Sequence, residues 1–294
     1  IPALGEPVGP LFGLDDTVLD LAITANRPDG MSMVGIAREV AALTGARLNL
    51  PQLESASTYK PFEPDASSAL SMLNGGVYGL TALDNIDCEA IPPTWLKQRL
   101  ERAGLRSVNA VVDITNLVML EQGQPLHAFD ADALENICGQ KVSAESFGLR
   151  QAKSDESFRA LDGNQLTLNQ SCQVVTCHDI PIALAGVIGS AESGVTTNTR
   201  RIWLESAMFT PTAVRTTARS IGLRNDASSR FEKGLPSEMT LLTAHRAVEL
   251  MQEHLSAQQV GCWVCGEVNK SVEPLNLRRD AVHRLMGPLS KQHS

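Results

Sequence analysis

Apolar residues recur with two different periods along the chain, and each period predicts its own kind of secondary structure. Spacing of three and four residues, bounded by Ser, Pro or Gly, predicts amphipathic helices. The expected helices cover residues 33–44, 94–103, 113–122, 211–221 and 237–255. Alternation of apolar and polar residues predicts strands at residues 18–23, 77–83, 172–177, 181–187, 201–207 and 259–268. Two segments rich in polar and turn-forming residues are expected to lack such elements: a linker at 51–75 and a loop at 223–234.

Turn residues mark two further local structures. Asn26 to Gly30 predicts a turn, after which Ser32 is expected to cap the helix that Gly45 stops. Asp162-Gly163, between two alternating runs, predicts a β-hairpin with a type I′ turn. The strand and helix within residues 1–50 are too small to bury a core of their own, so they are expected to need a partner segment.

The stretch from Val111 to Asp130 places many polar side chains among residues of buried type. Asp113 is expected to cap a short helix that Gly123 ends. Pro125 then stiffens the next turn, so His127 is expected on a fixed loop. Polar side chains on a core-anchored turn are a common construction of binding sites. A lone histidine beside a proline is nevertheless more often structural, so this pattern alone leaves its role open.

The strand expected at residues 201–207 carries a carboxylate among apolar residues. Its two faces are Ile202, Leu204 and Ser206 on one side, and Trp203, Glu205 and Ala207 on the other. Such a glutamate fits either an exposed position on an edge strand or a functional carboxylate with apolar neighbours. The segment from Gly186 to Gly194 has neither dinucleotide-binding nor phosphate-binding spacing. It predicts either tight turns or a backbone that comes close to a ligand.

The composition is that of an ordinary globular protein, with 43% hydrophobic and 20% charged residues. The net charge of −8 argues against an indiscriminate nucleic-acid binder. Between residues 200 and 234 the balance reverses, because seven basic residues stand against three acidic ones. No run approaches the roughly 20 apolar residues that span a bilayer. The chain begins with Ile1 and has no signal peptide, so we expect an excised fragment.

The reactive side chains do not form a familiar catalytic or metal-binding motif. Of the six cysteines, only Cys262 and Cys265 have metal-type spacing, and no second Cys or His pair completes a zinc set. We therefore expect reduced, structural cysteines and no metal site. The nucleophile elbow and the common metallopeptidase and calcium-loop motifs are also missing from the sequence. If the chain is an enzyme, it is expected to position water rather than to form a covalent intermediate.

Four long segments resemble the beta chain of bacterial-type phenylalanyl-tRNA synthetase. They are Val-Val-Asp-Ile-Thr-Asn-Leu-Val-Met-Leu-Glu-Gln-Gly-Gln-Pro-Leu-His-Ala-Phe-Asp (111–130), Ala-Leu-Ala-Gly-Val-Ile-Gly (183–189), Trp-Leu-Glu-Ser-Ala-Met-Phe (203–209) and Gly-Leu-Arg-Asn-Asp-Ala-Ser-Ser-Arg-Phe-Glu-Lys-Gly (222–234). Residues 26–30 with the following helix, and residues 275–287, extend the resemblance across nearly the whole chain.

This resemblance implies an α+β fold in which mixed and antiparallel sheets and packed helices form a B3/B4-like editing module. It implies three parts: residues 1–50 as the second half of a split B1-like domain, residues 51–267 as the B3/B4 tRNA-editing domain, and residues 268–294 as the start of a B5-like domain. In this family the editing module hydrolyses tRNA(Phe) that wrongly carries tyrosine, and the aminoacylation site lies in the alpha subunit.

The resemblance also implies which residues form the editing pocket. They are Arg106, Thr115, Asn116, Pro125, His127, Gly186, Gly189, Glu205, Asn225 and Ala227. Glu205 would accept a hydrogen bond from the tyrosine phenol, and phenylalanine would leave that buried carboxylate unpaired. The two glycines would let the backbone approach the aromatic ring, with Pro125 and Ala227 completing the binding wall.

The remaining residues would act at the ester. His127, Asn116, Thr115 and Asn225 form the implied catalytic group, in which His127 and Asn116 orient the ester and the attacking water. Arg106 would hold the 3′ end of the tRNA. Many members of the family have Thr where this chain has Asn225, and this departure can alter the water geometry or the pocket volume.

The partners implied by the resemblance are tRNA(Phe) and the alpha subunit, in a heterotetramer of two alpha and two beta chains. The implied location is cytoplasmic, without a membrane. No cofactor is expected in this fragment, whereas ATP and Mg²⁺ are implied for the full synthetase. Two alternatives are a non-catalytic tRNA-docking and assembly fragment and a free-standing aminoacyl-tRNA hydrolase. The intact set of Arg106, His127 and Glu205 favours editing over the first, and incomplete domains at both ends argue against the second.

Overall fold

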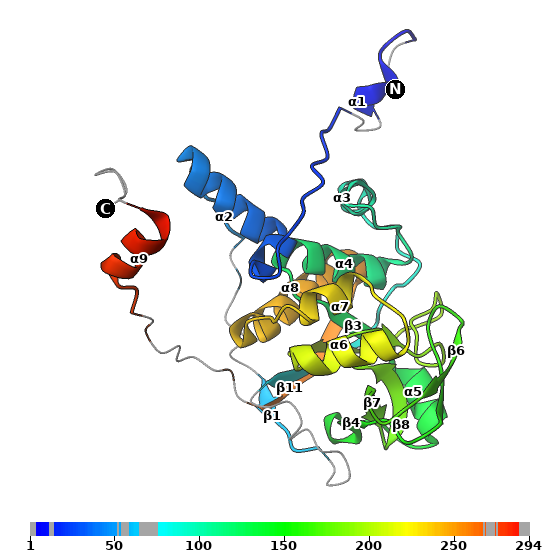
Figure 1. Cartoon of the computed structure of the whole chain (residues 1–294). Coiled ribbons are helices and arrows are strands. Elements are labelled where there is room, and N and C mark those ends of the chain that lie inside the picture. Colours follow the sequence, from blue (N-terminus) through cyan, green and yellow to red (C-terminus); the bar gives the residue numbers. More distant parts are fainter. Residues whose placement is uncertain are drawn as a thin grey trace.

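The computed structural model describes residues 4–11, 15–51, 53, 59–64, 76–266, 268, 274 and 276–287 (Figure 1). The helices are α1 (Val8–Leu11), η1 (Pro28–Met31), α2 (Met33–Thr44), α3 (Thr94–Arg102), α4 (Ala110–Gln122), α5 (Ala131–Cys138), η3 (Ala144–Ser146), α6 (Pro211–Ser220), α7 (Asp226–Phe231), α8 (Ser237–Leu255) and α9 (Arg279–Met286). The strands are β1 (Lys60–Pro61), β2 (Val77–Asp84), β3 (Leu126–Asp130), β4 (Phe147–Gln151), β5 (Glu156–Arg159), β6 (Gln165–Leu168), β7 (Gln173–Cys177), β8 (Ile180–Leu184), β9 (Ile188–Gly189), β10 (Ile202–Ala207) and β11 (Gln258–Gly266).

Two sheets and a separate hairpin hold these strands. Within the described residues, the larger sheet has the order β1-β11-β2-β10-β3, and the smaller has the order β4-β7-β8-β9. β1 runs parallel to β11, while the other neighbours in both sheets are antiparallel. Among the described strands, β5 and β6 pair with each other as a separate two-stranded sheet. The α+β class with mixed and antiparallel sheets is therefore confirmed.

The larger sheet separates two hydrophobic cores. Ile202 and Leu204 of β10 belong to the core that also contains buried residues of α3, α4 and α8. Trp203 and Ala207 belong to the core shared with β4, β7 and β8. In Figure 1, α4 and α8 lie on one side of the larger sheet and the smaller sheet lies on the other. The predicted alternation of β10 is confirmed, and its strand lies inside the sheet rather than at an edge.

The N-terminal region agrees with the predicted helix but not with the predicted strand. Ser32 accepts a hydrogen bond from the Gly35 amide, and Gly45 ends α2 with a left-handed φ of 71°. Residues 18–23 were predicted to form a strand, and that prediction is wrong because no strand pairs with them in the part of the chain that the structure describes. Their apolar side chains are largely exposed, as shown by Leu19 at 73%. Alternation alone therefore does not produce a strand without a partner.

The stretch from Val111 to Asp130 departs from its prediction at two points. The helix begins a turn earlier than expected, because Asn109 caps it by accepting a hydrogen bond from the Val112 amide. Asp113 lies inside the first turn and accepts hydrogen bonds from Ser107 Oγ at 2.5 Å and from the Val108 amide at 2.9 Å. His127, predicted on a loop, instead belongs to β3. The predicted end of α4 at Gly123 is confirmed by its φ of 86°.

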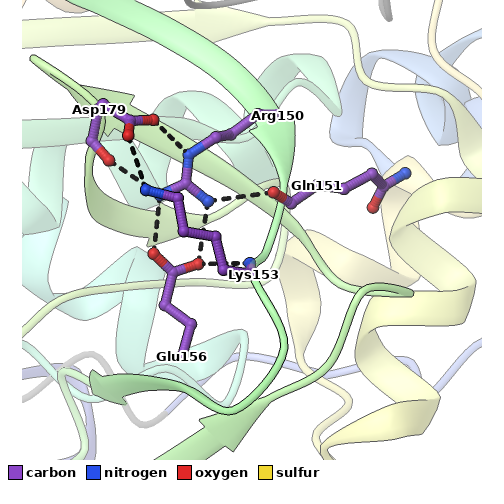
Figure 2. A network of polar contacts seen from close by, with 5 residues as sticks. All are labelled: Arg150, Gln151, Lys153, Glu156 and Asp179. Carbon is purple, nitrogen blue, oxygen red and sulfur yellow. Dashed lines mark hydrogen bonds and ion pairs between the residues drawn. The ribbon is translucent and has the colours of Figure 1, made fainter.

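The predicted hairpin forms, but the type I′ turn occurs elsewhere. Gly163 has a φ of 88° whereas Asp162 is not left-handed, so this loop is not type I′. His178 and Asp179, between β7 and β8, both have positive φ (46° and 65°), as a type I′ turn requires. A charged network surrounds that turn (Figure 2).

The centre of this network is the guanidinium of Arg150 on β4. It bonds to Asp179 Oδ1 at 2.6 Å and to both carboxylate oxygens of Glu156 at 2.7 and 2.9 Å, while Lys153 Nζ lies 2.8 Å from Asp179 Oδ2. Arg150 is only 12% exposed, so water competes little for these bonds. The network joins the β7–β8 turn to β4, to Lys153 and to the first residue of β5, and so stabilises a turn without glycine.

The segment at residues 223–234 was predicted as a polar loop, and this is wrong in part because it contains α7. Asn225 and Ser228 form a capping box at the start of that helix. The predicted linker at 51–75 is described only at residues 51, 53 and 59–64, and Lys60–Pro61 form β1 there. Its other residues, and residue 267 in the last predicted strand, lie outside the described part of the chain.

Candidate functional site

Two polar side chains from neighbouring strands share the face of the larger sheet that meets the smaller sheet. His127 on β3 is the register partner of Glu205 on β10, so the two side chains stand side by side. Both line a cavity of about 70 Å³. Of the ten predicted pocket residues, those that line this cavity are Pro125, His127, Gly186, Gly189, Glu205 and Ala227.

Glu205 is a buried carboxyl group whose partner was not anticipated from the sequence. It is 6% exposed, and its Oε2 accepts a hydrogen bond of 2.6 Å from the hydroxyl of Tyr78 on β2. Burial raises the pKa of Glu205 to about 7, and the hydrogen bond from Tyr78 opposes that rise. Burial and the adjacent carboxylate raise the pKa of Tyr78 well above its usual value, so Tyr78 remains the donor.

His127 faces the cavity as a neutral base. Burial lowers its pKa to about 4, because the charged imidazolium would lose its hydration there. Its ring lies edge-on to Phe129 with centroids 4.5 Å apart, and its Nε2 is buried without a hydrogen-bond partner among the described residues. An unpaired ring nitrogen beside a cavity is suited to binding a water or a ligand atom.

Two glycines allow the loop around β9 to approach this histidine and the aromatic wall. A Cβ at Gly189 would lie 2.5 Å from His127 Nε2, closer than real contacts allow. A Cβ at Gly186 would lie 2.9 Å from Val214 and 3.0 Å from Phe231, and Gly186 also has a positive φ of 69°. The need for glycine at both positions is therefore steric, and at Gly186 also conformational.

Asn225 does not line the cavity but supports its wall. Its Oδ1 accepts from the Ser228 amide, while its Nδ2 donates to the Val187 carbonyl at 2.7 Å. Val187 and Ala227 both line the cavity. One amide side chain thus fastens the glycine-containing loop to the start of α7.

The other three predicted residues lie outside the cavity lining. Thr115 and Asn116 lie on α4, where Thr115 is buried and its hydroxyl donates to the Val112 carbonyl at 2.8 Å. Asn116 is partly exposed. Arg106 lies in the exposed segment before α4 and makes no hydrogen bond or ion pair among the described residues. The structure therefore brings together one group around the cavity and leaves this second group apart from it.

A further contact holds the cavity walls to the N-terminal region. Arg230 on α7 is 5% exposed, and its Nε donates to the Met31 carbonyl at 3.2 Å. Its guanidinium also bonds to Asp226. A Cβ built at Gly123, just before Pro125 of the cavity, would lie 3.2 Å from Ser32 Cβ. The η1–α2 connection thus contacts both α7 and the end of α4.

The cavity brings together groups of three chemical kinds. The described residues contain no group of three His, Cys, Asp or Glu side chains placed to hold a metal ion. Likewise, none of the described helices has the length and apolar character needed to cross a bilayer. What the cavity offers is a neutral imidazole, a buried carboxyl group with a pKa near neutrality and a close-approaching backbone.

Comparison with known proteins identifies the class of this module. A family model described as the B3/4 domain matches residues 75–256, a range that contains every lining residue of the cavity. The chain therefore belongs to the B3/4 domain family.

Its relatives extend this result beyond the matched domain. The chain is 73% identical over 293 residues to the "Phenylalanine--tRNA ligase beta subunit" of Prochlorococcus marinus (strain MIT 9313), an alignment that covers 100% of this chain and 36% of that protein. It is 62% identical to the protein of the same name from Parasynechococcus marenigrum (strain WH8102), covering 99% of this chain and 36% of that protein. The chain thus spans about a third of the length of these curated relatives. The family resemblance seen in the sequence is confirmed.

Among solved structures, the chain aligns with an N-terminal fragment of the phenylalanyl-tRNA synthetase beta-subunit from Pyrococcus horikoshii. The alignment covers 94% of this chain and 77% of that chain, with 15% sequence identity and a TM-score of 0.38.

Proposed function

We propose that this chain is the editing part of a phenylalanine–tRNA ligase beta subunit and hydrolyses tRNA(Phe) that carries tyrosine. Membership in the B3/4 family and the relatives' names support this assignment. The observation that carries it is the carboxyl group of Glu205, which is buried in an internal strand yet lines a cavity. Such a group is costly to bury, and a ligand that donates a hydrogen bond to it recovers part of that cost.

Glu205 supplies the discrimination in this proposal. A tyrosyl phenol entering the cavity donates a hydrogen bond to the carboxyl group. A phenylalanyl ring excludes water from the carboxyl group and has no hydroxyl to replace the lost hydrogen bond. A site built to hydrogen-bond a substrate hydroxyl can reject the analogue without it by roughly 10⁴ or more. The lack of a Cβ at Gly186 and Gly189 lets the backbone of this loop lie against the ring once the wall has moved to admit it.

In this proposal the protein accelerates hydrolysis by holding the attacking water and the ester in the geometry of the reaction. His127, neutral near pH 7, holds the attacking water through its unpaired ring nitrogen next to the ester. Asn116 and Thr115 on α4 orient the terminal ribose and the ester, and Arg106 holds the 3′ end of the tRNA outside the cavity. Asn225 contributes by fixing the carbonyl of Val187, which lines the same cavity as His127.

The wider assignments belong to the same proposal. Residues 1–50 are the second half of a B1-like domain, residues 51–267 the editing domain, and residues 268–294 the beginning of a B5-like domain. The partners are tRNA(Phe) and the alpha subunit of a cytoplasmic heterotetramer, whose aminoacylation reaction uses ATP and Mg²⁺ at a site outside this chain.

The test compares hydrolysis of Tyr-tRNA(Phe) and Phe-tRNA(Phe) by the chain and by its Glu205→Gln variant. The wild-type chain is expected to hydrolyse the tyrosyl ester faster, and Glu205→Gln, which keeps the size of the side chain, is expected to remove most of that preference. Equal rates on both esters would contradict the role of Glu205. Binding of tRNA(Phe) without hydrolysis of either ester would instead support a non-catalytic docking fragment.

A further inference from the structure

The two carboxylate oxygens of Glu205 have different environments. Oε2 accepts the hydrogen bond from the Tyr78 hydroxyl, whereas Oε1 has no hydrogen-bond partner among the described residues. Tyr78 is fully buried, and its ring lies edge-on to Phe209 with centroids 6.4 Å apart. Phe209 itself lines the cavity. A tyrosine of the protein is therefore already hydrogen-bonded to one of the two oxygens of the carboxyl group that is proposed to recognise the hydroxyl of a substrate tyrosine.

We propose that Tyr78 is a specificity-determining positioning residue, which holds Oε2 of Glu205 so that Oε1 is the single acceptor offered to a ligand hydroxyl. This inference rests on the proposed function, since the hydroxyl in question is that of the tyrosyl ester. A carboxyl group fixed by one internal donor has one defined acceptor direction. Without Tyr78 the carboxyl group of Glu205 can rotate. Its acceptor oxygen then has no fixed direction, and the carboxyl group distinguishes tyrosyl from phenylalanyl ligands less well.

Tyr78 also controls the protonation of Glu205. Its hydrogen bond stabilises the carboxylate and opposes the rise in pKa that burial causes. Among the residues that the structure describes, the other titratable groups facing this pair are His127 on β3, Cys177 on β7 and Cys265 on β11. Burial lowers the pKa of His127 and raises the pKa values of both thiols, so all three are uncharged near pH 7. Tyr78 is thus the one neighbour described here that favours the ionised form of Glu205.

The chain provides a matched control for this residue. The chain contains two tyrosines. The hydroxyl of the other one, Tyr59, lies 3.4 Å from the hydroxyl of Thr81. Thr81 pairs with Leu204 and therefore lies on the opposite face of β2 from Tyr78. Tyr59→Phe removes the same hydroxyl from the other side of the same sheet.

The first measurement is the pKa of Glu205 by NMR with ¹³C-labelled glutamate, assigned by the signal lost in Glu205→Gln. The value near 7 is expected to rise in Tyr78→Phe and to stay unchanged in Tyr59→Phe. In the Tyr59→Phe background, labelling with 3-fluorotyrosine places the label at Tyr78 alone and makes it a stronger donor. This labelling is expected to lower the pKa of Glu205, and it preserves the fold if Tyr78→Phe does not.

The second measurement is the ratio of hydrolysis rates on Tyr-tRNA(Phe) and Phe-tRNA(Phe) across pH. Tyr78→Phe is expected to lower this ratio at pH 7 by on the order of tenfold, the effect of one hydrogen bond, and to move its pH midpoint upward with the pKa of Glu205. Tyr59→Phe is expected to change neither. A folded Tyr78→Phe protein with an unchanged Glu205 pKa and an unchanged ratio would overturn the inference. If Tyr78→Phe shifts the pKa of Glu205 but the wild-type chain hydrolyses both esters at the same rate, the proposed function is contradicted. That result would still support the coupling between Tyr78 and Glu205.

Discussion

His127 and Glu205 are register partners on adjacent strands, and burial moves their pKa values in opposite directions. The pKa of His127 falls from 6.5 to about 4, whereas the pKa of Glu205 rises from 4.5 to about 7. Folding therefore transfers the preference for a proton from the histidine to the glutamate. Between about pH 4.5 and 6.5 the two contributions to the pH dependence of stability offset each other, and substitution of either residue separates them.

Glu205→Gln is expected to become more stable relative to wild type as the pH rises. A carboxyl group whose pKa is raised in the fold stabilises the protein below its unfolded pKa, and this contribution is lost as the pH rises through about 7. A shift from 4.5 to about 7 corresponds to about 3 kcal/mol between pH 4 and pH 8. Urea denaturation of both proteins at the two pH values measures this difference. A difference in unfolding free energy that does not vary with pH would contradict the raised pKa.

His127→Gln is expected to show the opposite trend. A histidine whose pKa is lowered in the fold contributes stability above pH 6.5, and that stability is lost as the pH falls through about 4. The variant should therefore gain about 3 kcal/mol relative to wild type between pH 8 and pH 4. His245→Gln on α8, whose ring lies beside Glu249 outside the cavity, is the control. Equal pH trends for the two variants would show that His127 is not buried as described.

Gly189→Ala is expected to displace His127, because the new Cβ would lie 2.5 Å from Nε2 and 2.6 Å from Cε1. Overpacking of this kind costs about 1–3 kcal/mol of stability, and displacement of a positioning group lowers the hydrolysis rate by roughly 10²-fold. Gly194→Ala is the matched control: its Cβ meets Cδ1 of Leu161 at 2.8 Å, and that half-exposed side chain can move. Full activity of Gly189→Ala would exclude His127 from the reaction.

Asn225→Asp separates the two roles of this side chain. The carboxylate still caps α7 through the Ser228 amide, but it cannot donate to the Val187 carbonyl. Two facing acceptors should cost about 1–3 kcal/mol and loosen the loop. Hydrogen exchange of residues 186–189 is expected to accelerate and the hydrolysis rate to fall. Asn198→Asp, on an exposed loop, should change neither. If exchange at 186–189 is unaltered, Asn225 does not hold the cavity wall.

Local signals predicted most of the elements correctly. Ser32 and Gly45 bound α2, and Gly123 ends α4, because caps depend on residues a few positions away. The same local reasoning placed the start of α4 wrongly. Asn109 and Asp113 are both suitable caps one turn apart, and only the packing decides between them. Asp113 is buried and bonded to Ser107 and Val108, so it serves the turn before the helix instead.

The partners of the cavity residues could not be predicted from local patterns. Glu205 was recognisable as a carboxylate on an apolar face, yet its donor Tyr78 lies 127 residues earlier in the chain. Choosing Tyr78 requires knowing that β2 pairs with β10, which periodicity does not reveal. Similarly, His178 and Asp179 form a type I′ turn without glycine, because Arg150 from another strand stabilises it.

A structure of the chain with bound tyrosine tests the central claim most directly. The cavity of about 70 Å³ is smaller than the roughly 150 Å³ that holds a benzene ring in an apolar protein cavity, so binding should displace part of its wall. We expect the phenol oxygen within hydrogen-bonding distance of Glu205 Oε1 and the ring against the loop at residues 186–189. Phenylalanine under the same conditions should leave the cavity empty. Tyrosine bound away from Glu205 and this loop, or equal occupancy by phenylalanine, would contradict the account.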